Sequence, residues 1–529
     1  MEKLNLEKTA LGIEFGSTRI KAVLIDENYQ IVGSGEYKWD NQYEKGIWTY
    51  DLNEVWIGMQ DAYRELANAV KQKYNLELTE VGAIGFSGMM HGYLPFDSSG
   101  KQLVPFRTWR NTTTEVSAKE LTELFSFNIP HRWSIAHLYQ AILDNEEHVK
   151  YIDFLTTLAG FVHWKVSDEK VLGVGEASGM FPIDPKTEDY DGEMLRLFDE
   201  KLSKYKYSWR VRDILPPIQK AGEIAGRLTK KGAKMLDPTG TLRSGIPLCP
   251  PEGDAGTGMV ATNSIDAKTG NISAGTSVFA MIVLEENLSN YYHEIDVVTT
   301  PSAKPVAMVH CNNFTSDIND WVSMFKEIIE LTGMDINSSE IFTLLLKEAL
   351  EANSDTGGIV NCNYYSGEPI TGFEEGRPLL VRMPDSKLTL ANFMRAQIYS
   401  AIATLKIGMD ILTENENIDV DYILGHGGFF KTKNVGQQLM ADALNIPISV
   451  MTTASEGGPW GMAILAMYAL DNNGHRTLAD YLNKEVFTTI KKKTLYPEKE
   501  GNKSFINYME QYKKLLKVEQ AAIEHLSIN

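Results

Sequence analysis

Two stretches of this chain, about half of its 529 residues apart, repeat the same short pattern. Each stretch runs from an apolar segment through a turn of small residues into a second apolar segment, as Ile13–Ile25 and again as Ile272–Leu284. Both predict a β-hairpin whose tip is a glycine followed by two hydroxyl residues, Gly16-Ser17-Thr18 and Gly275-Thr276-Ser277. A pattern repeated across half a chain indicates two related domains rather than an array of short repeats.

The composition of the two hairpin tips favours phosphate binding. A turn that begins with glycine brings backbone N–H groups together without a Cβ in the way, and such a concave group of amides binds anions. The neighbouring serine and threonine hydroxyls add further donors for phosphate oxygens. Either tip alone could be an ordinary hairpin turn. Because the tip occurs twice, we interpret the pair as a clamp on a polyphosphate, one tip on each side of a cleft.

Length and composition place the chain among globular proteins of more than one domain. A chain of 529 residues, 43% hydrophobic and 23% charged, exceeds what one hydrophobic core supports. No apolar run is long enough to cross a membrane, and Met1–Glu7 does not resemble a signal peptide. Three isolated cysteines fit a reducing compartment: Cys249, Cys311 and Cys362. We therefore expect a cytoplasmic protein with no membrane partner.

The net charge of −19 argues against nucleic acid as a partner. Binding to DNA or RNA that does not depend on sequence relies on lysine and arginine against phosphates. A nucleotide remains compatible with this charge, because its pocket can use backbone amides and Mg²⁺.

The first ninety or so residues predict an α/β domain, since apolar runs alternate with amphipathic stretches. A helix over Asp51–Lys73 carries apolar residues at helical spacing and can be capped by Asp51. The apolar run Val81–Phe86 predicts a buried strand that leads into Ser87–Gly92, at the strand end where ligands usually bind. Three strands of a β-meander are expected before the helix, over Leu11–Phe15, Ile20–Ile25 and Gln30–Tyr37.

From about residue 115 to 245 the pattern is mostly helical and less regular, which indicates an insertion around the core sheet. The second half predicts a long helix over Leu388–Thr413, a strand over Val420–Leu424 and a helix over Asn434–Leu444. A last apolar helix begins near Gly457. The tail from Lys491, rich in lysine and glutamate, predicts a solvated helix.

Asp254 is the candidate catalytic base. It lies between Gly253 and Ala255, which let a substrate and a phosphate approach its carboxylate closely. In phosphoryl transfer such a base orients and deprotonates the attacking hydroxyl. Alternatively, Asp254 starts a turn or caps the following helix. Its place about twenty residues before the second tip favours the catalytic interpretation.

A polyol site is indicated by the mixed chemistry of Met89-Met90-His91-Gly92. Apolar Met90 and the hydrogen-bonding imidazole of His91 suit a ligand that needs a shaped wall and directional bonds. Trp109 and Glu176 are further candidates for this wall. The alternatives are a structural histidine, a surface loop at Trp109 and a turn at Glu176.

Two other elements could complete a nucleotide site. Glu14 could hold Mg²⁺, which prefers a few carboxylates together with phosphate oxygens; otherwise it pairs with Arg19 or Lys21. The turn Gly425–Gly428 joins a strand to a helix, and bare backbone there lets a nucleoside lie close. Many strand-to-helix turns also use glycine for steric reasons alone.

In order and spacing, these motifs resemble the FGGY carbohydrate kinases over nearly the whole chain, and the Met-His-Gly element is most similar to the xylulokinase branch. Gly12–Thr18 with Lys21 resembles the first phosphate motif, and Ser273–Ser277 the second. Gly253-Asp254-Ala255 is similar to the segment that bears the catalytic aspartate. The adenosine-binding signature is matched by Gly427-Gly428, by Gln438–Leu444 and by Glu456-Gly457-Gly458.

This resemblance implies an α/β fold of two ribonuclease-H-like, actin-like ATPase domains around a central cleft. The N-terminal domain, residues 1–265, would bind the sugar, and the C-terminal domain, residues 266–529, the nucleotide. ATP and Mg²⁺ would be the cofactors, a small sugar the substrate, and a homodimer is left open. The implied roles are a general base at Asp254; sugar contacts at Met90, His91, Trp109 and Glu176; metal ligands at Glu14 and Asp254; and nucleotide contacts at Gly16, Ser17, Thr18, Lys21, Gly275, Thr276, Ser277, Gly427, Gly428 and Asn434.

The chain departs from the family pattern near the metal, the sugar and the adenosine. Glu14 stands where the family usually has aspartate. Trp109-Arg110-Asn111-Thr112-Thr113 replaces the Trp-Asn-Asp-Gly-Arg of xylulokinases, and a site that loses matched hydrogen-bond partners selects among polyols differently. Phe429 and Phe430 lengthen the adenosine turn. The alternatives are therefore a kinase for ribulose, gluconate or a deoxy sugar, and an actin-like ATP-binding protein that phosphorylates no sugar.

Overall fold

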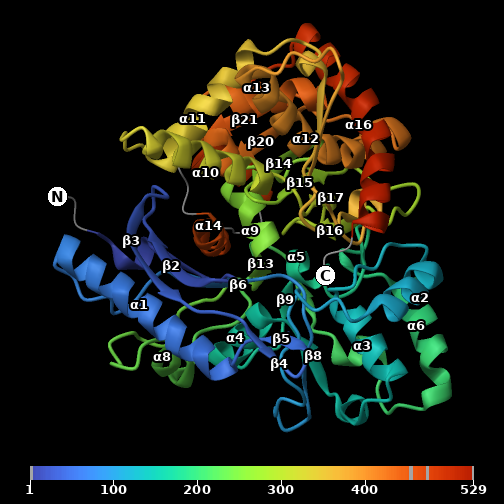
Figure 1. The fold of residues 1–529 in the computed structure, drawn as a ribbon. Helices are drawn as coiled ribbons and strands as arrows, with labels where there is room; N and C mark the ends of the chain where they lie inside the picture. Colours follow the sequence, from blue (N-terminus) through green and yellow to red (C-terminus); the bar gives the residue numbers. More distant parts are fainter. Residues whose placement is uncertain (1–3, 452–456, 472–475, 527–529) are drawn as a thin grey trace.

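The computed structural model describes residues 4–451, 457–471 and 476–526. Two β-sheets, one in each half of the chain, form two lobes with helices on their faces (Figure 1). The first lobe is built on five strands in the order β13 (Glu252–Gly253), β6 (Ala83–Gly88), β1 (Ala10–Phe15), β2 (Arg19–Ile25) and β3 (Ile31–Lys38).

The second lobe is built on a sheet of seven strands. Their order is β16 (Ile295–Thr299), β17 (Pro305–Cys311), β15 (Val278–Val283), β14 (Thr269–Ala274), β20 (Tyr422–His426), β21 (Ile448–Met451) and β22 (Lys492–Leu495).

The two sheets share one topology. In the first sheet, β3, β2 and β1 are antiparallel neighbours, and β6 and β13 then run parallel to β1. In the second sheet, β17, β15 and β14 are antiparallel neighbours, and β20 and β21 then run parallel to β14. The repeated sequence forms the corresponding hairpin of each sheet, β1–β2 and β14–β15. The prediction of two related halves from this repeat is confirmed.

A long helix connects the meander to the parallel strands in each lobe. Helix α1 (Leu52–Tyr74) covers the first sheet, and Asp51 caps it by accepting a hydrogen bond from the backbone N–H of Asn53, as predicted. In the second lobe the equivalent connection ends in α12 (Leu390–Asp410), which is buried along most of its length. Such helical crossovers allow the following strand to run parallel to the first one. The predicted helix over Asn434–Leu444 is α13 (Val435–Leu444).

Between β6 and β13 the chain forms the expected helical insertion. Trp133 and Tyr139 are among its largest fully buried side chains, and they belong to a hydrophobic cluster that also includes residues of the first sheet and of the last apolar helix. Its main helices are α2 (Glu115–Phe125), α3 (Ser134–Leu143), α4 (Leu158–Ser167), α5 (Val174–Ala177), α6 (Gly192–Leu202) and α8 (Lys230–Leu236). The second lobe adds α10 (Ser316–Leu331) and α11 (Ser338–Glu348) on its outer surface.

One helix from the end of the chain packs on the first lobe. Helix α14 (Gly458–Asp471) lies against β1, β6 and α9 (Asp254–Ala261), which follows β13 (Figure 1). Its backbone approaches so closely that a Cβ on Gly12 would stand 2.1 Å from the carbonyl oxygen of Pro459. The division into residues 1–265 and 266–529 stays a prediction, since this helix of the second half belongs to the core of the first.

The tail predicted as a solvated helix from Lys491 begins instead with strand β22, and it is helical only from Lys499. This helix is not simply solvated. Helix α16 (Lys499–His525) buries Phe505, Tyr508 and Tyr512 in the core of the second lobe. The Tyr508 hydroxyl donates to the carbonyl oxygens of Asn361 and Ala396, both at 3.1 Å. Apart from the buried Glu519, the lysines and glutamates of α16 lie mainly on its outer face. Among the described residues, no helix combines the length and the apolar character that crossing a bilayer requires.

Candidate active site

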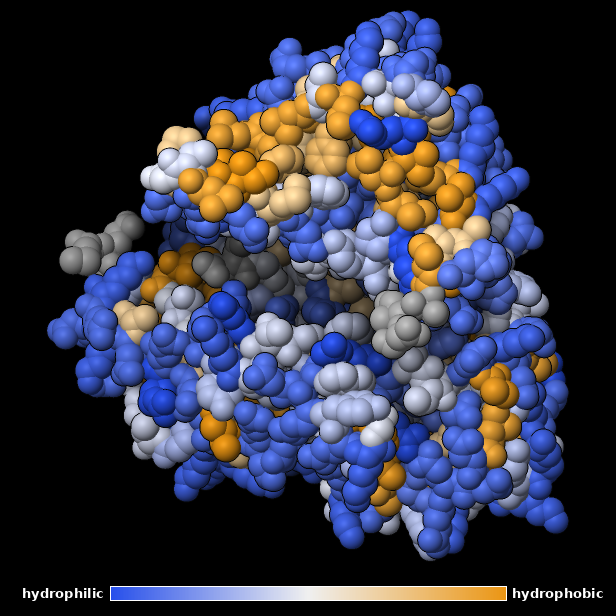
Figure 2. Space-filling model, in the orientation of Figure 1, coloured by the Kyte–Doolittle hydropathy of each residue, from blue (hydrophilic) through white to orange (hydrophobic). Residues whose placement is uncertain are grey.

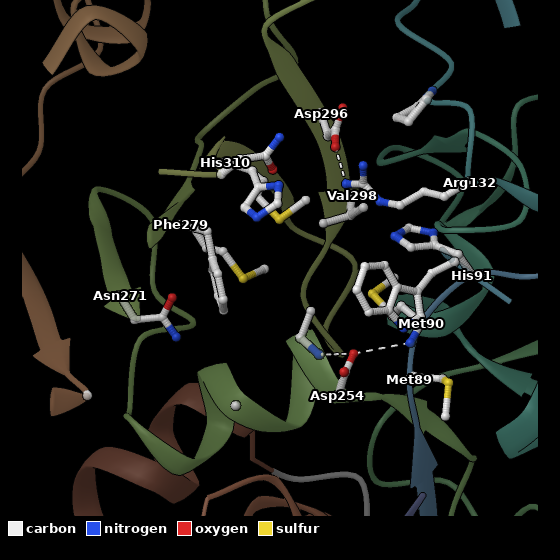
Figure 3. A pocket seen from close by; sticks show the side chains of 18 of the residues that line it. Met89, Met90, His91, Arg132, Asp254, Asn271, Phe279, Asp296, Val298 and His310 are labelled. Carbon is white, nitrogen blue, oxygen red and sulfur yellow. Dashed lines mark hydrogen bonds and ion pairs between the residues drawn. The ribbon is translucent and has the colours of Figure 1, made fainter. Parts of the chain in front are cut away.

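A cavity of about 1770 Å³ lies between the two lobes, and residues of both line it (Figures 2 and 3). Many of the residues predicted from sequence meet there although they come from distant parts of the chain. The predicted residues on its wall are Glu14, Ser17, Met90, His91, Trp109, Asp254, Gly427 and Asn434. The other predicted residues do not line the cavity: Gly16, Thr18, Lys21, Glu176, Gly275, Thr276, Ser277 and Gly428.

Asp254 is the first residue of α9 and stands at the cavity wall, where the parallel strands of the first sheet end. Its Oδ1 accepts hydrogen bonds from the backbone N–H groups of Met90, at 3.1 Å, and Ala255, at 3.0 Å (Figure 3). Within the described residues, Oδ2 has no partner. The side chain is open to the cavity but lies deep in the molecule, and this burial raises the pKa of the Asp254 carboxyl above its usual range. A base needs a free oxygen and a raised affinity for protons, and Asp254 has both.

His91 presents one free nitrogen to the cavity side of the loop that follows β6. Its Nδ1 lies 3.1 Å from the carbonyl oxygen of Gly179, which can only accept, so Nδ1 carries the proton and Nε2 is the acceptor. Burial lowers the pKa of His91 to about 3, and the nearby charge of Arg132 adds to this effect. The imidazole is therefore neutral at ordinary pH. Its left-handed backbone, with φ of 70°, turns the chain sharply before Gly92.

The wall opposite the sheet ends carries charged residues that the sequence did not single out. The guanidinium of Arg132, beside His91, forms an ion pair with Asp296 of β16 (Figure 3). Asp296 also accepts from the Asn128 side-chain amide at 3.2 Å, and His310 of β17 lines the same part of the cavity. These residues come from a loop of the first lobe and from two neighbouring strands of the second, β16 and β17. No local pattern marks them, because only the tertiary fold brings them together.

The structure places the two remaining candidates for the sugar wall differently. Trp109 lines the cavity, but its indole N–H donates to the Ser17 hydroxyl at 3.3 Å, so it contacts the first hairpin tip. Glu176 is fully buried behind Gly253, where a Cβ would stand 2.5 Å from its Oε2. It lies behind the wall rather than on it, and burial raises the pKa of Glu176 well above its usual value.

The carbonyl oxygens of the first tip, Gly16–Thr18, all accept hydrogen bonds from Trp39 or Tyr50. The Trp39 indole N–H donates to Gly16 O at 2.7 Å, and the Trp39 backbone N–H donates to Thr18 O at 3.2 Å. The Tyr50 hydroxyl donates to Ser17 O at 2.6 Å. Carbonyl oxygens would repel a phosphate, whereas the amides of the tip would attract it. With the oxygens engaged elsewhere, the tip is suited to an anion.

The second tip, Gly275–Ser277, shows the same arrangement with different partners. Thr276 O accepts from the backbone N–H groups of Phe314, at 3.0 Å, and Thr315, at 3.2 Å. Gly275 O accepts from the Thr315 hydroxyl at 2.6 Å. The tip follows directly on Ala274, whose backbone packs against Gly427 on the cavity wall.

Glu14 lies on β1 of the first sheet and lines the same cavity as Asp254. Its Oε2 is buried and has no hydrogen-bond partner within the described residues. Burial raises the pKa of Glu14 to about 8, and the negative charge of Asp254 adds to the increase, while Lys21 opposes it. Gly458, at the start of α14, leaves room for this carboxylate, because a Cβ there would lie 1.6 Å from Oε2.

The predicted adenosine turn borders the cavity at its second-lobe end. Gly427 has a φ of 102°, and a Cβ there would stand 2.4 Å from the carbonyl oxygen of Ala274. Asn434 precedes α13 and accepts from the Lys493 ammonium at 2.7 Å. Phe429 and Phe430, which lengthen this turn, are buried in the second core. Glu456 of the same predicted signature lies outside the described residues.

The two sheets of equal topology around one cavity define the fold class of the protein, an α/β fold of two actin-like, ribonuclease-H-like domains. The FGGY family of carbohydrate kinases matches with its N-terminal domain over residues 9–260 and with its C-terminal domain over residues 270–470. The chain belongs to this family. The resemblance inferred from the motifs is confirmed.

Curated relatives are distant. A xylulose kinase of Haemophilus influenzae is 21% identical over 514 residues, which cover 95% of this chain and 98% of that protein. A glycerol kinase of Thermococcus kodakarensis is 23% identical over 290 residues, 52% of this chain and 54% of that protein.

Solved structures share the fold across almost the whole chain. The gluconate kinase of Lactobacillus acidophilus superposes with a TM-score of 0.79 at 18% identity, covering 98% of this chain and 99% of that one. A ligand-bound xylulose kinase of the same organism gives 0.78 at 18% identity, covering 98% and 100%. The glycerol kinase of Plasmodium falciparum with ADP gives 0.75 at 17% identity, covering 96% and 98%.

Proposed function

We propose that this protein transfers the γ-phosphate of ATP to a hydroxyl of a small sugar of the xylulose type, with Asp254 as the general base. The observation that carries the proposal is the hydrogen bond from the Met90 backbone N–H to Asp254 Oδ1. It joins the candidate base to the loop that presents His91, in the same cavity as Ser17 and Gly427.

In this proposal the free Oδ2 of Asp254 accepts the proton of the attacking sugar hydroxyl. The neutral His91 accepts a second hydroxyl at Nε2 and so fixes the orientation of the sugar. Amides of the two tips hold the phosphate chain from the two lobes. Most of the acceleration in phosphoryl transfer comes from such positioning and from neutralised charge, so exclusion of water by the cleft matters as much as the base.

Glu14 and Asp254 have the donor chemistry that Mg²⁺ requires, and the unpartnered Oε2 of Glu14 fits a role as a ligand. We propose that these two carboxylates hold the cation together with phosphate oxygens. When bound, Mg²⁺ would neutralise the charge that develops on the transferred phosphoryl group. The glutamate in place of aspartate extends the carboxylate by one methylene toward Gly458.

Replacing Asp254 tests the proposed base. Asp254→Asn keeps the size and one acceptor oxygen but cannot take a proton, so we expect sugar-dependent ADP formation to fall by about 10²-fold or more. Binding of an unhydrolysable ATP analogue in the absence of Mg²⁺, measured by calorimetry, should stay within about twofold of the wild-type value because the tips are untouched. Asp168→Asn is the matched control, since Asp168 is exposed and its left-handed backbone suits asparagine. Wild-type turnover in Asp254→Asn would disprove the role.

The identity of the sugar is a separate question. Trp109 bound to the first tip and the Arg132–Asp296 pair on the wall favour a polyol other than xylulose as the second candidate. ADP release should be measured with D-xylulose, D-ribulose, D-gluconate and deoxy sugars, each with mass spectrometry of the product. Turnover of D-xylulose alone refutes the second candidate. ATP binding without a phosphorylated product from any sugar would instead favour an actin-like protein that is not a kinase.

The assembly state and the location of the protein rest on the sequence alone. We propose a cytoplasmic protein and keep the homodimer as its candidate assembly. Analytical ultracentrifugation over a range of concentrations tests the dimer, and a sedimentation coefficient that stays at the monomer value contradicts it.

A further inference from the structure

Glu252 is a buried acid that the proposed reaction does not use. It lies on β13, two residues before Asp254, and only 1% of its surface is exposed. Its Oε2 accepts from the backbone N–H of Glu176 at 2.9 Å, and its Oε1 accepts from that of Gly175 at 3.4 Å. A buried carboxylate is costly unless it serves an interaction. Here it ties the edge strand of the first sheet to α5.

Two glycines beside Glu252, Gly173 and Gly175, leave space for its carboxylate. A Cβ on Gly173 would stand 2.2 Å from Glu252 Oε1, and a Cβ on Gly175 would stand 2.5 Å from Oε2. Both distances are far below van der Waals contact. The Gly173 backbone N–H also donates to the carbonyl oxygen of Pro251 at 2.8 Å. The segment 173–179, called the α5 segment below, is therefore shaped to the side chain of Glu252.

The other end of the α5 segment holds His91. The Gly179 carbonyl oxygen accepts a hydrogen bond from the Nδ1–H of His91 at 3.1 Å. A Cβ on Gly179 would stand 2.7 Å from this nitrogen and 2.9 Å from Cε of Met90. The backbone N–H of Met90 in turn donates to Asp254. One short segment thus contacts the strand that leads to the base and the loop that carries the imidazole.

The α5 segment is also anchored to the second lobe. The Thr299 backbone N–H donates to the Ser178 hydroxyl at 3.0 Å, and the Thr299 hydroxyl donates to the Val174 carbonyl oxygen at 3.1 Å. Thr299 is the last residue of β16, the strand that also bears Asp296. Because Thr299 holds both Val174 and Ser178, the α5 segment can fix the positions of the first-lobe residues that it contacts.

We propose that Glu252 is a positioning residue that locks the α5 segment against β13 and so fixes the distance between Asp254 and His91. The inference rests on the proposed function, in which these two side chains contact the same sugar. Glu252 does not line the cavity; it acts through the backbone amides of Gly175 and Glu176. A small shift of the α5 segment would move Asp254 away from the sugar hydroxyl that it must deprotonate. A misplacement of about 1 Å can lower the rate by about 10²-fold.

Two variants test this role from opposite sides of the contact. Glu252→Gln keeps the shape but offers one acceptor to two donors, and Gly175→Ala pushes the carboxylate away from the segment. We expect each to lower kcat by about 10- to 100-fold while KM for ATP stays within about twofold, because the tips are far from the change. The activity should be measured with D-xylulose, D-ribulose and D-gluconate as phosphate acceptors. Each kcat should be calculated per site that binds an unhydrolysable ATP analogue, so that misfolded protein does not count.

Matched controls separate positioning from general damage. Glu519→Gln removes a buried carboxylate that accepts from the Arg377 backbone N–H in the second lobe. Gly192→Ala adds a methyl group at the start of α6, where no atom lies within 4 Å. Both should keep wild-type kcat. A merely structural role of Glu252 would lower the fraction of competent sites and leave kcat per site unchanged.

The outcomes are distinguishable from failure of the proposed function. Turnover in Asp254→Asn means that the proposed base is wrong, whatever Glu252 does. If Asp254→Asn is inactive while Glu252→Gln or Gly175→Ala keeps wild-type kcat per competent site, the positioning role is wrong and the proposed function stands. A rise in KM for ATP with unchanged kcat also overturns it.

Discussion

Three histidines in the first lobe are fully buried and neutral in the folded protein. Burial lowers the pKa of His91 to about 3, of His137 to about 3 and of His163 to about 4. In the unfolded chain each titrates near its ordinary pKa of 6.5. Below that pH the unfolded state binds protons that the folded state does not, so each histidine reduces the free energy of unfolding as the pH falls from 6.5 toward its folded pKa.

His163 allows this effect to be isolated, because it lies away from the cavity. Its Nε2 lies 2.9 Å from the Ala225 carbonyl oxygen, which the side-chain amide of glutamine can also reach. We expect His163→Gln to be less stable than the wild type at pH 7. At pH 5 its deficit in free energy of unfolding should be about 2 kcal/mol smaller, because the variant has lost one titrating group.

Urea denaturation of both proteins at several pH values between 5 and 7 measures this difference. A deficit of His163→Gln that stays constant over this range would contradict the depressed pKa.

At the scale of elements, the contact of α14 with α9 packs a helix of the second half of the chain against the first lobe. Gly461 of α14 lies against the backbone of α9, where a Cβ would stand 2.1 Å from the carbonyl oxygen of Thr257 and 3.2 Å from the N of Ala261. Backbone atoms cannot swing aside as a flexible side chain can. A methyl group there must push the two helices apart.

Gly461→Ala should therefore destabilise the protein. Alanine gains about 1 kcal/mol of helix propensity over glycine. Overpacking of a close helix contact costs about 1–3 kcal/mol, and here the obstacle is backbone, so the cost should prevail. Thermal unfolding should show a lower Tm for Gly461→Ala and an unchanged or higher Tm for Gly192→Ala. The reverse order would show that α14 and α9 can separate freely.

The elements that local sequence determines could be predicted, and those that depend on tertiary contact could not. The hairpins, α1 with its Asp51 cap and the strand before Met90 follow from spacing and turn chemistry. The position of α14 on the first sheet does not, because its apolar residues are compatible with any core. The buried face of α16 was missed for a related reason, since its tyrosines are spaced among many charged residues.

The candidate site shows the same division. Asp254, His91 and Ser17 lie in short motifs that identify them as candidate site residues, and the structure brings them to one cavity. Arg132 and Asp296 have no motif, because each becomes meaningful only when the loop before α3 meets β16. The burial of Glu176 could not be foreseen either, since it depends on the glycine at 253 that lies over it.

For the whole molecule, the cavity has walls from two lobes, and polar contacts join these walls on one side of the cavity. The Arg132–Asp296 pair and the hydrogen bonds of Thr299 connect them through β16. The first tip and Asp254 belong to one lobe, and the second tip with Gly427 belongs to the other. A ligand that contacts both walls binds the closed arrangement better and shifts the population toward it.

Sugar and nucleotide should therefore stabilise the protein more together than separately. Each ligand raises the Tm by binding the folded state, but the first to bind also reduces the cost of closing the lobes for the second. We expect the increase in Tm with D-xylulose and an unhydrolysable ATP analogue together to exceed the sum of the separate increases, and small-angle scattering to give a smaller radius of gyration. The best acceptor of the sugar panel replaces D-xylulose if another is preferred. Strictly additive shifts with an unchanged radius would mean that the lobes do not close on their substrates.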